Sequence, residues 1–243
     1  MYTSLVRAQN VFGFFTTVAF AVAALIAGTD LLAPRTPSGT IRPTNTQVVK
    51  GRPHYYSTKR EEYAIIKFSL DADLSSLFTW NTKQVFVYVT AEWPAAAGNN
   101  ATNQAVIWDQ IITSPSSDHL ANIGPATLRK LKKSAAGKPI DPSRGKLSLK
   151  NQRPKYQITH PSSRIAETDG VELRLHYNVQ PWVGALTWDQ GRDYGRWKAT
   201  AGGASDAFAL PAIKKKDDGD KSDSSSSSSK KKTNNNNKKK AKA

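Results

Sequence analysis

The side chains that could act as a nucleophile, a general base or a metal ligand lie scattered along this chain. None of its four histidines stands at a metal-binding spacing such as H-E-x-x-H, and none accompanies a local nucleophile motif. The chain has no cysteine, which excludes disulfides, thiolate metal ligands and cysteine nucleophiles. Local motifs therefore predict no catalytic, cofactor-binding or metal-binding residues. The histidines are His54, His119, His160 and His176.

Two features come nearest to a catalytic or ligand pattern. Asp71 and Asp73 form a carboxylate pair, but they lie at a turn with no nearby histidine or third ligand, which favours ordinary turn acids. His176 lies within a strand-like segment, where a packed or edge position is a simpler interpretation than a base or a ligand. A Ser-His-Asp set assembled from distant segments stays open, because such sets are recognised by geometry and not by sequence position.

The positive charge first suggests a nucleic-acid partner. The formal net charge is +16, but residues 213–243 alone contribute eleven Lys against four Asp. The remaining excess forms no arginine-rich helix and no aromatic-basic stripe, so nucleic acid is not predicted as a partner. The tail itself could bind RNA or anionic lipid, although its Lys, Ser and Asn composition favours a solvated, disordered segment.

A membrane segment is the clearest element of the sequence. Residues 11–29 run for nineteen positions without a charge. A helix of that length spans about 28 Å, close to the hydrocarbon thickness of a bilayer. A cleaved signal peptide is the competing interpretation, because Ala21 and Ala23 give a small-x-small site. That site falls inside the apolar run, so the pattern favours an uncleaved signal-anchor helix over residues 11–32.

The orientation of this helix is not fixed by charge, because basic residues flank both of its ends. Asn100 begins the only N-x-S/T sequon of the chain, and a sequon has meaning only in a secretory lumen. Asn100 is therefore the candidate glycosylation site. The sequon favours a luminal position for the C-terminal domain, with residues 1–10 in the cytosol.

The core of the expected domain is the stretch at residues 71–93. Within it, residues 85–91 are mostly β-branched or aromatic and contain neither Gly nor Pro, which predicts a strand. Both its odd and its even positions are apolar. This pattern predicts cover on both faces, with Val87 and Tyr88 buried on opposite sides. We expect the preceding apolar residues, including Trp80, to join the same core.

Further strands are expected at residues 63–70, 104–112, 155–159 and 170–179, with Pro181 ending the last. Short strands separated by Gly and Pro, with almost no amphipathic helix, predict a mainly β fold of the antiparallel β-sandwich type. The expected division of the chain is a short cytosolic N-terminus at residues 1–10, a transmembrane signal-anchor helix at 11–32, a proline-bearing stalk at 33–53, a luminal β domain at 54–212 with a basic insertion at 128–153, and a disordered tail at 213–243.

One expected loop is unusually apolar. Residues 181–188 follow the last strand and carry two Trp, a Val and a Leu. An exposed apolar patch is typical of a protein or membrane contact, and Trp is common in both settings. Trp182 and Leu186 are therefore candidate contacts with a partner protein or with the membrane surface. The alternative is that the loop folds back and closes one end of the sandwich.

Taken together, these segments resemble subunit 3 of the eukaryotic signal peptidase complex, and the basic insertion and tail are typical of fungal members. The chain departs from the family at Tyr177, where Trp is common. The resemblance begins at Ser4, Arg7, Asn10 and Phe12, is sharpest over residues 71–74 and 77–89, and continues at 91–92, 103–109 and 177–179, with Pro181, Gly184 and Leu186.

The resemblance implies a single-pass protein of the endoplasmic reticulum membrane with its C-terminal domain in the lumen. It implies a non-catalytic subunit, not itself an enzyme, that stabilises and positions the separate catalytic serine protease subunit of a complex that removes signal peptides. The implied partners are the catalytic and other subunits, the lipid bilayer and, indirectly, nascent secretory chains; neither a cofactor nor nucleic acid is implied. The alternative is a self-contained luminal or secreted β-sandwich enzyme or binding protein.

Overall fold

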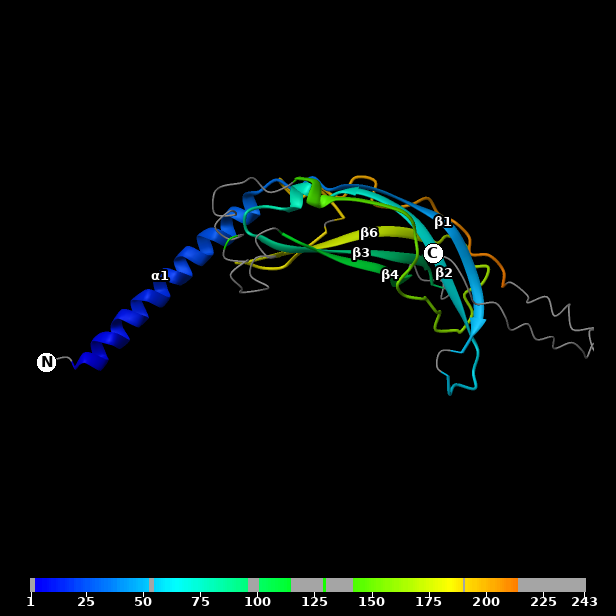
Figure 1. Ribbon diagram of the computed structural model, residues 1–243, viewed down its shortest axis with the longest axis horizontal. Helices are drawn as coiled ribbons and strands as arrows, with labels where there is room; N and C mark the ends of the chain where they lie inside the picture. Colours follow the sequence, from blue (N-terminus) through cyan, green and yellow to red (C-terminus); the bar gives the residue numbers. More distant parts are fainter. Residues whose placement is uncertain are drawn as a thin grey trace, which may run out of the picture.

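A long helix projects from one end of an arched β-sandwich in the computed structural model of the chain (Figure 1). The structure describes residues 3–52, 55–95, 101–114, 129, 142–189 and 191–213. The elements in chain order are α1 (Ser4–Leu32), β1 (Ser38–Gly51), β2 (Glu61–Asp73), the 3₁₀ turn η1 (Ser75–Leu77), β3 (Thr82–Pro94), β4 (Thr102–Thr113), the 3₁₀ turn η2 (Pro142–Gly145), β5 (Lys146–Gln152), β6 (Glu172–Pro181) and β7 (Thr187–Trp188).

Helix α1 is long and apolar enough to cross a membrane, and none of the residues in its most hydrophobic stretch is buried. Phe14, Phe20 and Leu25 are among its many exposed apolar side chains. A helix that is apolar on all sides needs an apolar environment on all sides, and a bilayer provides one. The structure therefore supports the membrane helix expected from the sequence.

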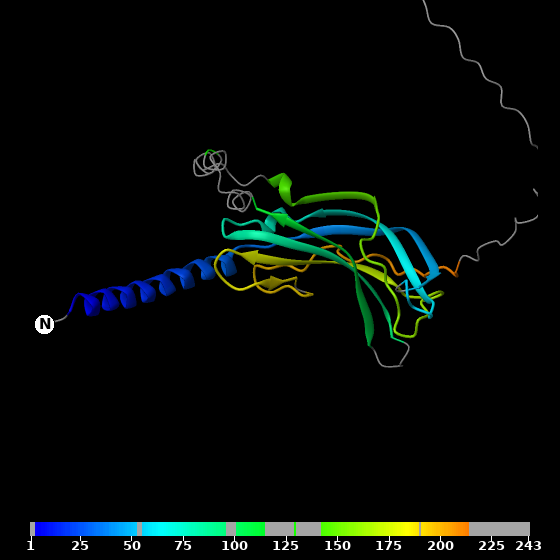
Figure 2. The same ribbon diagram turned by 60° about the horizontal axis from the view of Figure 1, so that its bottom comes forward.

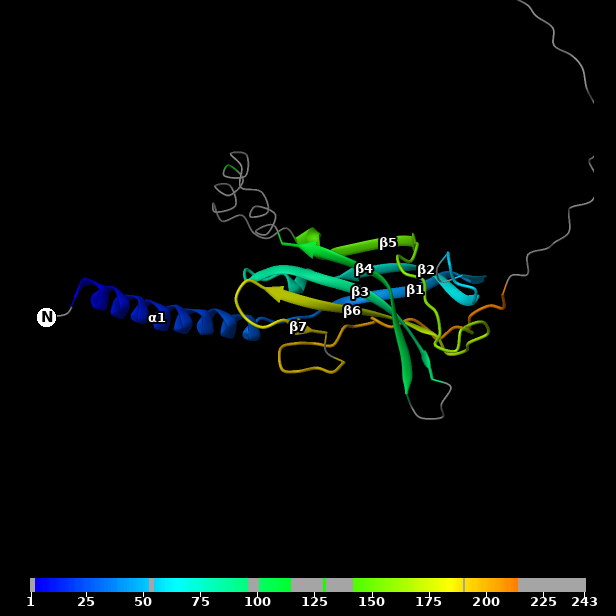
Figure 3. The same cartoon turned by 90° about the horizontal axis from the view of Figure 1, so that it is seen from below.

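Two antiparallel sheets pack face to face behind this helix (Figures 1 and 3). The smaller sheet has the strand order β1-β2-β5, and the larger has the order β4-β3-β6-β7. Strand β3 lies inside the larger sheet and pairs with β4 on one side and β6 on the other. The predicted mainly β fold, an antiparallel sandwich after an N-terminal helix, is confirmed.

Alternate side chains from both sheets fill the space between them. On β3, the inward Val85, Val87 and Val89 are completely buried. They face the inward side chains of β2, where Phe68 is also completely buried. Across the core, Phe68 of β2 packs against Trp108 of β4, with ring centroids 5.9 Å apart in a T-shaped arrangement. The period-two burial of apolar residues therefore accounts for the sandwich.

The expected stalk at residues 33–53 is instead largely a strand of the sandwich. Strand β1 pairs with β2 from Ser38 to Gly51 and buries Ile41 and Val48. Pro43 sits where the pairing shifts register, and proline is tolerated at such a bulge in an edge strand. The prolines here mark an irregular edge strand, and the domain begins a few residues after α1.

Part of the expected basic insertion also belongs to the sandwich. Strand β5 pairs with β2, and Leu147 is buried between the sheets. The basic side chains of β5 alternate with these contacts and conceal the short strand in the sequence. The expected strand at residues 155–159 is reduced to one bridge between Ile158 and Ala64. Residues 115–128 and 130–141 lie outside the described part of the chain.

Two expectations about the core need correction. Trp80 is 62% exposed. The neighbouring Asn81 turns inward and is 1% exposed, which leaves Trp80 on the outside of the same turn. Val87 is buried as expected, but Tyr88 on the opposite face is only partly buried. The described residues therefore cover β3 fully on its inner face and incompletely on its outer face.

A pair of aromatic truncations tests this core assignment. Phe68→Ala removes a completely buried ring, so it should lower the free energy of unfolding by about 3–5 kcal/mol. Trp80→Ala removes a mainly exposed ring and should change stability far less. Denaturant unfolding of the detergent-solubilised chain, followed by circular dichroism, measures both. Equal losses from the two substitutions would contradict the assignment.

Glu62 fastens the loop after residue 160 to strand β2. Its Oε2 accepts hydrogen bonds from the backbone N–H groups of Ile165 and Ala166, at 2.9 and 3.0 Å. The bond from Ala166, aided by that from Ile165, holds the pKa of the Glu62 carboxyl below its ordinary value against the opposing effect of burial. Ile165 is itself 1% exposed, so the ionised carboxylate holds part of the core in place.

The lowered pKa predicts a defined dependence of stability on pH. The contribution of Glu62 is fully present above its unfolded pKa of about 4.5 and is lost as the pH falls through the lower folded pKa. Glu62→Gln should therefore be less stable than the unmodified chain at pH 7. The difference in free energy of unfolding should shrink below pH 4.5. A difference that is constant from pH 7 to pH 3 would contradict this role.

Candidate functional site

A buried ion pair joins α1 to the sandwich. Arg35 Nη2 donates to Asp30 Oδ2 at 2.9 Å, and the two residues are 1% and 6% exposed. Arg35 Nη1 also donates to Thr187 Oγ1 at 2.6 Å, and Thr79 Oγ1 donates to Asp30 Oδ1 at 3.3 Å. The guanidinium lies 4.2 Å from the ring centroid of Trp197. The pair thus ties the last turn of α1 to three separate segments of the domain.

Backbone hydrogen bonds reinforce this junction. Arg35 N–H donates to Arg196 O at 3.1 Å, and Lys198 N–H donates to Arg35 O at 2.8 Å. Arg196 Nη1 donates to the carbonyl of Leu32, one of the acceptors left open at the C-terminal end of α1, at 3.1 Å. The connection between helix and domain is therefore a bonded joint and not a free linker.

Asn81 holds the loop between β6 and β7 against the same end of the domain. Its Nδ2 donates to Val183 O at 2.8 Å, and its Oδ1 accepts from Val183 N–H at 3.1 Å. The Asn81 carbonyl accepts from Trp182 N–H at 2.8 Å. Figures 2 and 3 show this loop beside the end of α1. A Cβ built at Gly184 would lie 3.4 Å from the Cβ of Ala27, so loop and helix are in close contact.

The structure places both candidate contact residues on this loop with their side chains partly in solvent. Trp182 is 40% exposed and Leu186 is 55% exposed. The loop backbone does fold against the domain, as one interpretation expected, but these two side chains are not part of the core. Their assignment as contacts stays a prediction. Asn100, the candidate glycosylation site, lies outside the described residues.

A second apolar surface lies on the outer face of the larger sheet. Ile111 on β4 and Trp188 on β7 are 53% and 55% exposed, and Phe86 on β3 lies between them and is partly buried. The strand pairing puts Trp188, Asn178, Phe86 and Ile111 in one row across the sheet. Tyr88 follows in the next row and stacks on Phe86, with centroids 5.5 Å apart. We call Phe86, Tyr88, Ile111 and Trp188 the sheet patch.

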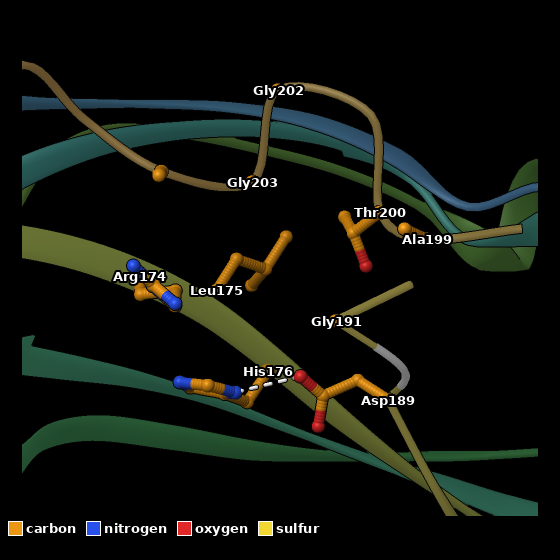
Figure 4. A pocket seen from close by; sticks show the side chains of 10 residues that line it. Arg174, Leu175, His176, Asp189, Gly191, Ala199, Thr200, Gly202 and Gly203 are labelled. Atoms are coloured by element: carbon orange, nitrogen blue, oxygen red, sulfur yellow. Dashed lines mark hydrogen bonds and ion pairs between the residues drawn. The ribbon is translucent and has the colours of Figure 1, made fainter. Parts of the chain in front are cut away.

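A polar relay beside the sheet patch has the spacing of a hydrolase triad. His176 Nδ1 lies 2.7 Å from Asp189 Oδ2, and His176 Nε2 lies 3.0 Å from Thr90 Oγ1. A hydroxyl, an imidazole and a carboxylate in this order are the elements of a nucleophilic hydrolase. The relay also borders a cavity of about 440 Å³ whose lining includes Arg174, His176, Asp189 and Thr200 (Figure 4).

The hydroxyl of this relay is poorly placed for catalysis. Thr90 is 1% exposed and does not line the cavity. Its Oγ1 also lies 3.5 Å from Gln104 Nε2 and 3.4 Å from the carbonyl of Arg174, which are long contacts within the sheet. A substrate carbonyl in the cavity cannot approach an oxygen enclosed in this way. The relay is therefore best explained as a hydrogen-bond network that joins β3, β6 and the segment after β7.

Of the sequence-predicted turn acids, Asp73 behaves as expected. Its Oδ1 accepts hydrogen bonds from the hydroxyl and the backbone N–H of Ser75, at 2.6 and 3.0 Å. The hydroxyl bond, followed by the backbone bond, holds the pKa of the Asp73 carboxyl below its ordinary value. Asp71 is exposed on β2 and takes no part in this turn. The two carboxylates therefore do not form a common site.

The fold and its junction define a class of protein: a β-sandwich bonded directly to a single apolar helix long enough to cross a membrane. Comparison with known families makes the assignment specific. Residues 1–127 and 140–199 match the family described as signal peptidase subunit. The chain belongs to this family, as the resemblance predicted.

Curated relatives carry the name signal peptidase complex subunit 3. A protein of Debaryomyces hansenii is 37% identical over 53% of this chain and 52% of its own length. One from Yarrowia lipolytica is 28% identical over 83% of this chain and 96% of its own length. One from Gallus gallus is 30% identical over 76% of this chain and 87% of its own length. The match thus spans about half of the first relative and nearly all of the second.

Removing one partner of the junction pair tests its importance. Asp30→Leu leaves the Arg35 guanidinium buried without its counter-ion, which should cost about 3–5 kcal/mol of stability. Asp30→Leu combined with Arg35→Met should recover most of this loss, because an apolar pair of similar volume needs no compensation. Denaturant unfolding of the three detergent-solubilised chains measures the effect. A double variant no more stable than the single variant would show that the ion pair is not the source of the loss.

Proposed function

We propose that this protein is a non-catalytic subunit of the endoplasmic reticulum signal peptidase complex. In this role α1 crosses the membrane once, and the sandwich stands in the lumen. There it stabilises and positions a separate catalytic serine protease subunit, which removes signal peptides from nascent secretory and membrane proteins. Membership of the signal peptidase subunit family supports this role. The relatives are named as subunit 3 of the signal peptidase complex, and this name is the basis for proposing that complex.

The sheet patch is the observation that carries this proposal. Strand β3 has apolar residues on both faces, yet the described part of the chain covers only its inner face fully. A central strand with apolar side chains on both faces is typical of a sheet covered on both sides. In a complex, a partner subunit supplies the second cover. Such a patch, apolar at its centre and rimmed by Gln84, Gln180 and Asp109, has the composition of a protein interface.

The position of the patch suits a partner that is itself in the membrane. In Figure 1, α1 slopes away toward the side of the domain on which β3, β4 and β6 lie. The outer face of this sheet therefore turns toward the side of the helix and not away from it. The bonded junction keeps that orientation, so a membrane-bound catalytic subunit beside α1 would meet the patch directly.

A self-contained hydrolase is the second candidate, and the relay of Thr90, His176 and Asp189 is the observation in its favour. Its weakness is the enclosed Thr90 hydroxyl. Thr90→Val removes that hydroxyl and keeps the shape of the side chain. If the purified chain cleaves a signal-peptide substrate and Thr90→Val abolishes that activity, the proposed non-catalytic role is wrong. We expect the purified chain to show no such cleavage before or after the substitution.

The association with the catalytic subunit is tested by a charge placed on the sheet patch. Ile111→Glu puts an unpaired carboxylate in the proposed contact, beside Phe86, so less catalytic subunit should copurify in mild detergent. Val49→Glu is the matched control, because Val49 is 45% exposed on β1 of the other sheet. Both variants should unfold at the temperature of the unmodified chain. Equal recovery of the catalytic subunit with both variants would argue against the sheet patch as the interface.

The luminal orientation is tested in sealed microsomes. Protease added outside should leave the sandwich intact until detergent opens the vesicles, and an endoglycosidase should shift the band if Asn100 carries a glycan. Digestion of the sandwich in sealed vesicles would place it in the cytosol and overturn the topology. A mature N-terminus just after Ala23 would show instead that the apolar segment is a cleaved signal.

A further inference from the structure

Exposed apolar side chains surround the place where α1 joins the domain. Trp80 is 62% exposed, Trp182 is 40% exposed and Leu186 is 55% exposed. On the helix itself, Leu31 and Leu32 are 61% and 65% exposed. We call Trp80, Trp182 and Leu186 the rim. The rim lies at the α1 end of the domain, whereas Phe86 and Ile111 of the sheet patch begin four residues beyond Thr82 along β3, about 13 Å away. Trp188 of the sheet patch is only two residues from Leu186 and borders both surfaces.

The bilayer position follows from α1. The uncharged run ends at Thr29, so the hydrocarbon boundary lies close to that residue. Ala27 lies inside the run, within one helical turn of its end. Gly184 lies in the loop between β6 and β7, which carries Trp182 and Leu186 and which we call the rim loop, and it packs against Ala27. The tip of the loop therefore lies at the depth of the hydrocarbon boundary, whatever the orientation of the protein across the membrane.

Gly184 allows this close approach through its backbone. Its φ of +128° lies in a region that residues with a side chain rarely adopt. A Cβ there would lie in van der Waals contact with Ala27, at 3.4 Å from its Cβ and 3.7 Å from its Cα, so the backbone conformation and not a clash is what favours glycine. The loop is thus shaped to run against the helix, and its neighbours Trp182 and Leu186 are carried to the same depth.

The hydrogen bonds that Asn81 makes to this loop are with its backbone. Asn81 bonds the backbone of Trp182 and Val183, while Trp182 and Leu186 are 40% and 55% exposed. The Lys83 ammonium lies 5.4 Å from the Trp182 ring centroid, which places a cation beside the rim. Indole rings with a neighbouring cation have the chemistry of the lipid headgroup zone, where Trp accumulates and a cation meets phosphate.

We propose that the rim inserts into the headgroup region of the bilayer that α1 crosses, so that the domain rests on the membrane at two places, the helix and the rim. The occupant of this surface is phospholipid. The ion pair of Asp30 and Arg35 fixes the helix to the domain, and the rim then fixes the tilt of both against the bilayer. The sheet patch is held at a set height above the membrane. This inference needs only that α1 crosses a bilayer, and it does not rest on the proposed subunit function.

The test uses site-directed spin labels, and the chain is suited to them because it has no cysteine of its own. Leu186→Cys places a nitroxide on the rim. Ile111→Cys is a matched control on the sheet patch, since Leu186 and Ile111 are 55% and 53% exposed. The full chain is reconstituted in phosphatidylcholine vesicles, and collisions of the nitroxide with oxygen and with a water-soluble nickel chelate are measured. Trp182→Cys is a second rim label in case one substitution disturbs folding.

At the rim, the ratio of oxygen to nickel accessibility should exceed that at position 111 several-fold, because oxygen concentrates in the bilayer and the chelate stays in water. Equal ratios at positions 186, 182 and 111 in variants that unfold at the temperature of the unmodified chain would overturn the proposal. The same accessibility measurements are repeated with the labelled chain in the purified complex. Rim labels shielded there from both reagents would assign the rim to a protein partner, which also overturns it.

Discussion

The buried ion pair between Asp30 and Arg35 is the constraint on which the arrangement of the whole molecule depends. Removing two charges from water is costly, so a buried pair depends on close geometry and on additional hydrogen bonds. Here the carboxylate takes a hydrogen bond from Thr79, and the guanidinium bonds Thr187 and lies against Trp197. These partners come from three segments far apart in sequence. These contacts can therefore form only when the sandwich is folded and α1 ends at its base. Arg35 Nε is buried and has no hydrogen-bond partner among the described residues.

Much of the fold could be predicted because its signals are local. The nineteen uncharged residues of α1 predict a membrane helix, and the apolar run of β3 predicts a core strand, without reference to any other segment. Strand β1 was not predicted because the prolines of this segment, such as Pro43, are typical of a stalk. An edge strand with a bulge also accepts a proline. Strand β5 was not predicted because its alternation of apolar and polar residues is short and its polar positions are occupied largely by lysines of a basic segment. Trp80 was misassigned because its exposure depends on Asn81, whose hydrogen bonds reach a loop more than a hundred residues away.

The features of the candidate site also differ in whether a local sequence signal predicts them. Composition alone made Trp182 and Leu186 candidate contact residues, since a loop with so many apolar residues is unusual, and their role stays a prediction. The junction was missed because Asp30 resembles an ordinary charge at the end of a membrane segment. One signal was available: an acid and a base five residues apart, directly after the apolar run, can pair once the helix ends between them. The relay of His176 and Asp189 had no such signal, because only the β6–β7 turn brings the two together.

The choice of an ion pair at the junction has a physical explanation. An apolar pair of the same volume would hold the domain about as firmly, since buried charges add little net stability. It would not, however, fix the depth of the helix. A shift of α1 by one turn into the bilayer would draw Asp30 into hydrocarbon, where a charged side chain costs several kcal/mol, and would separate it from Arg35. A shift the other way would expose the apolar turn that ends at Thr29 to water. The pair therefore favours one depth of the helix, and the proposed contact of the rim with the headgroups depends on the same depth, because the loop that carries Trp182 and Leu186 lies against Ala27.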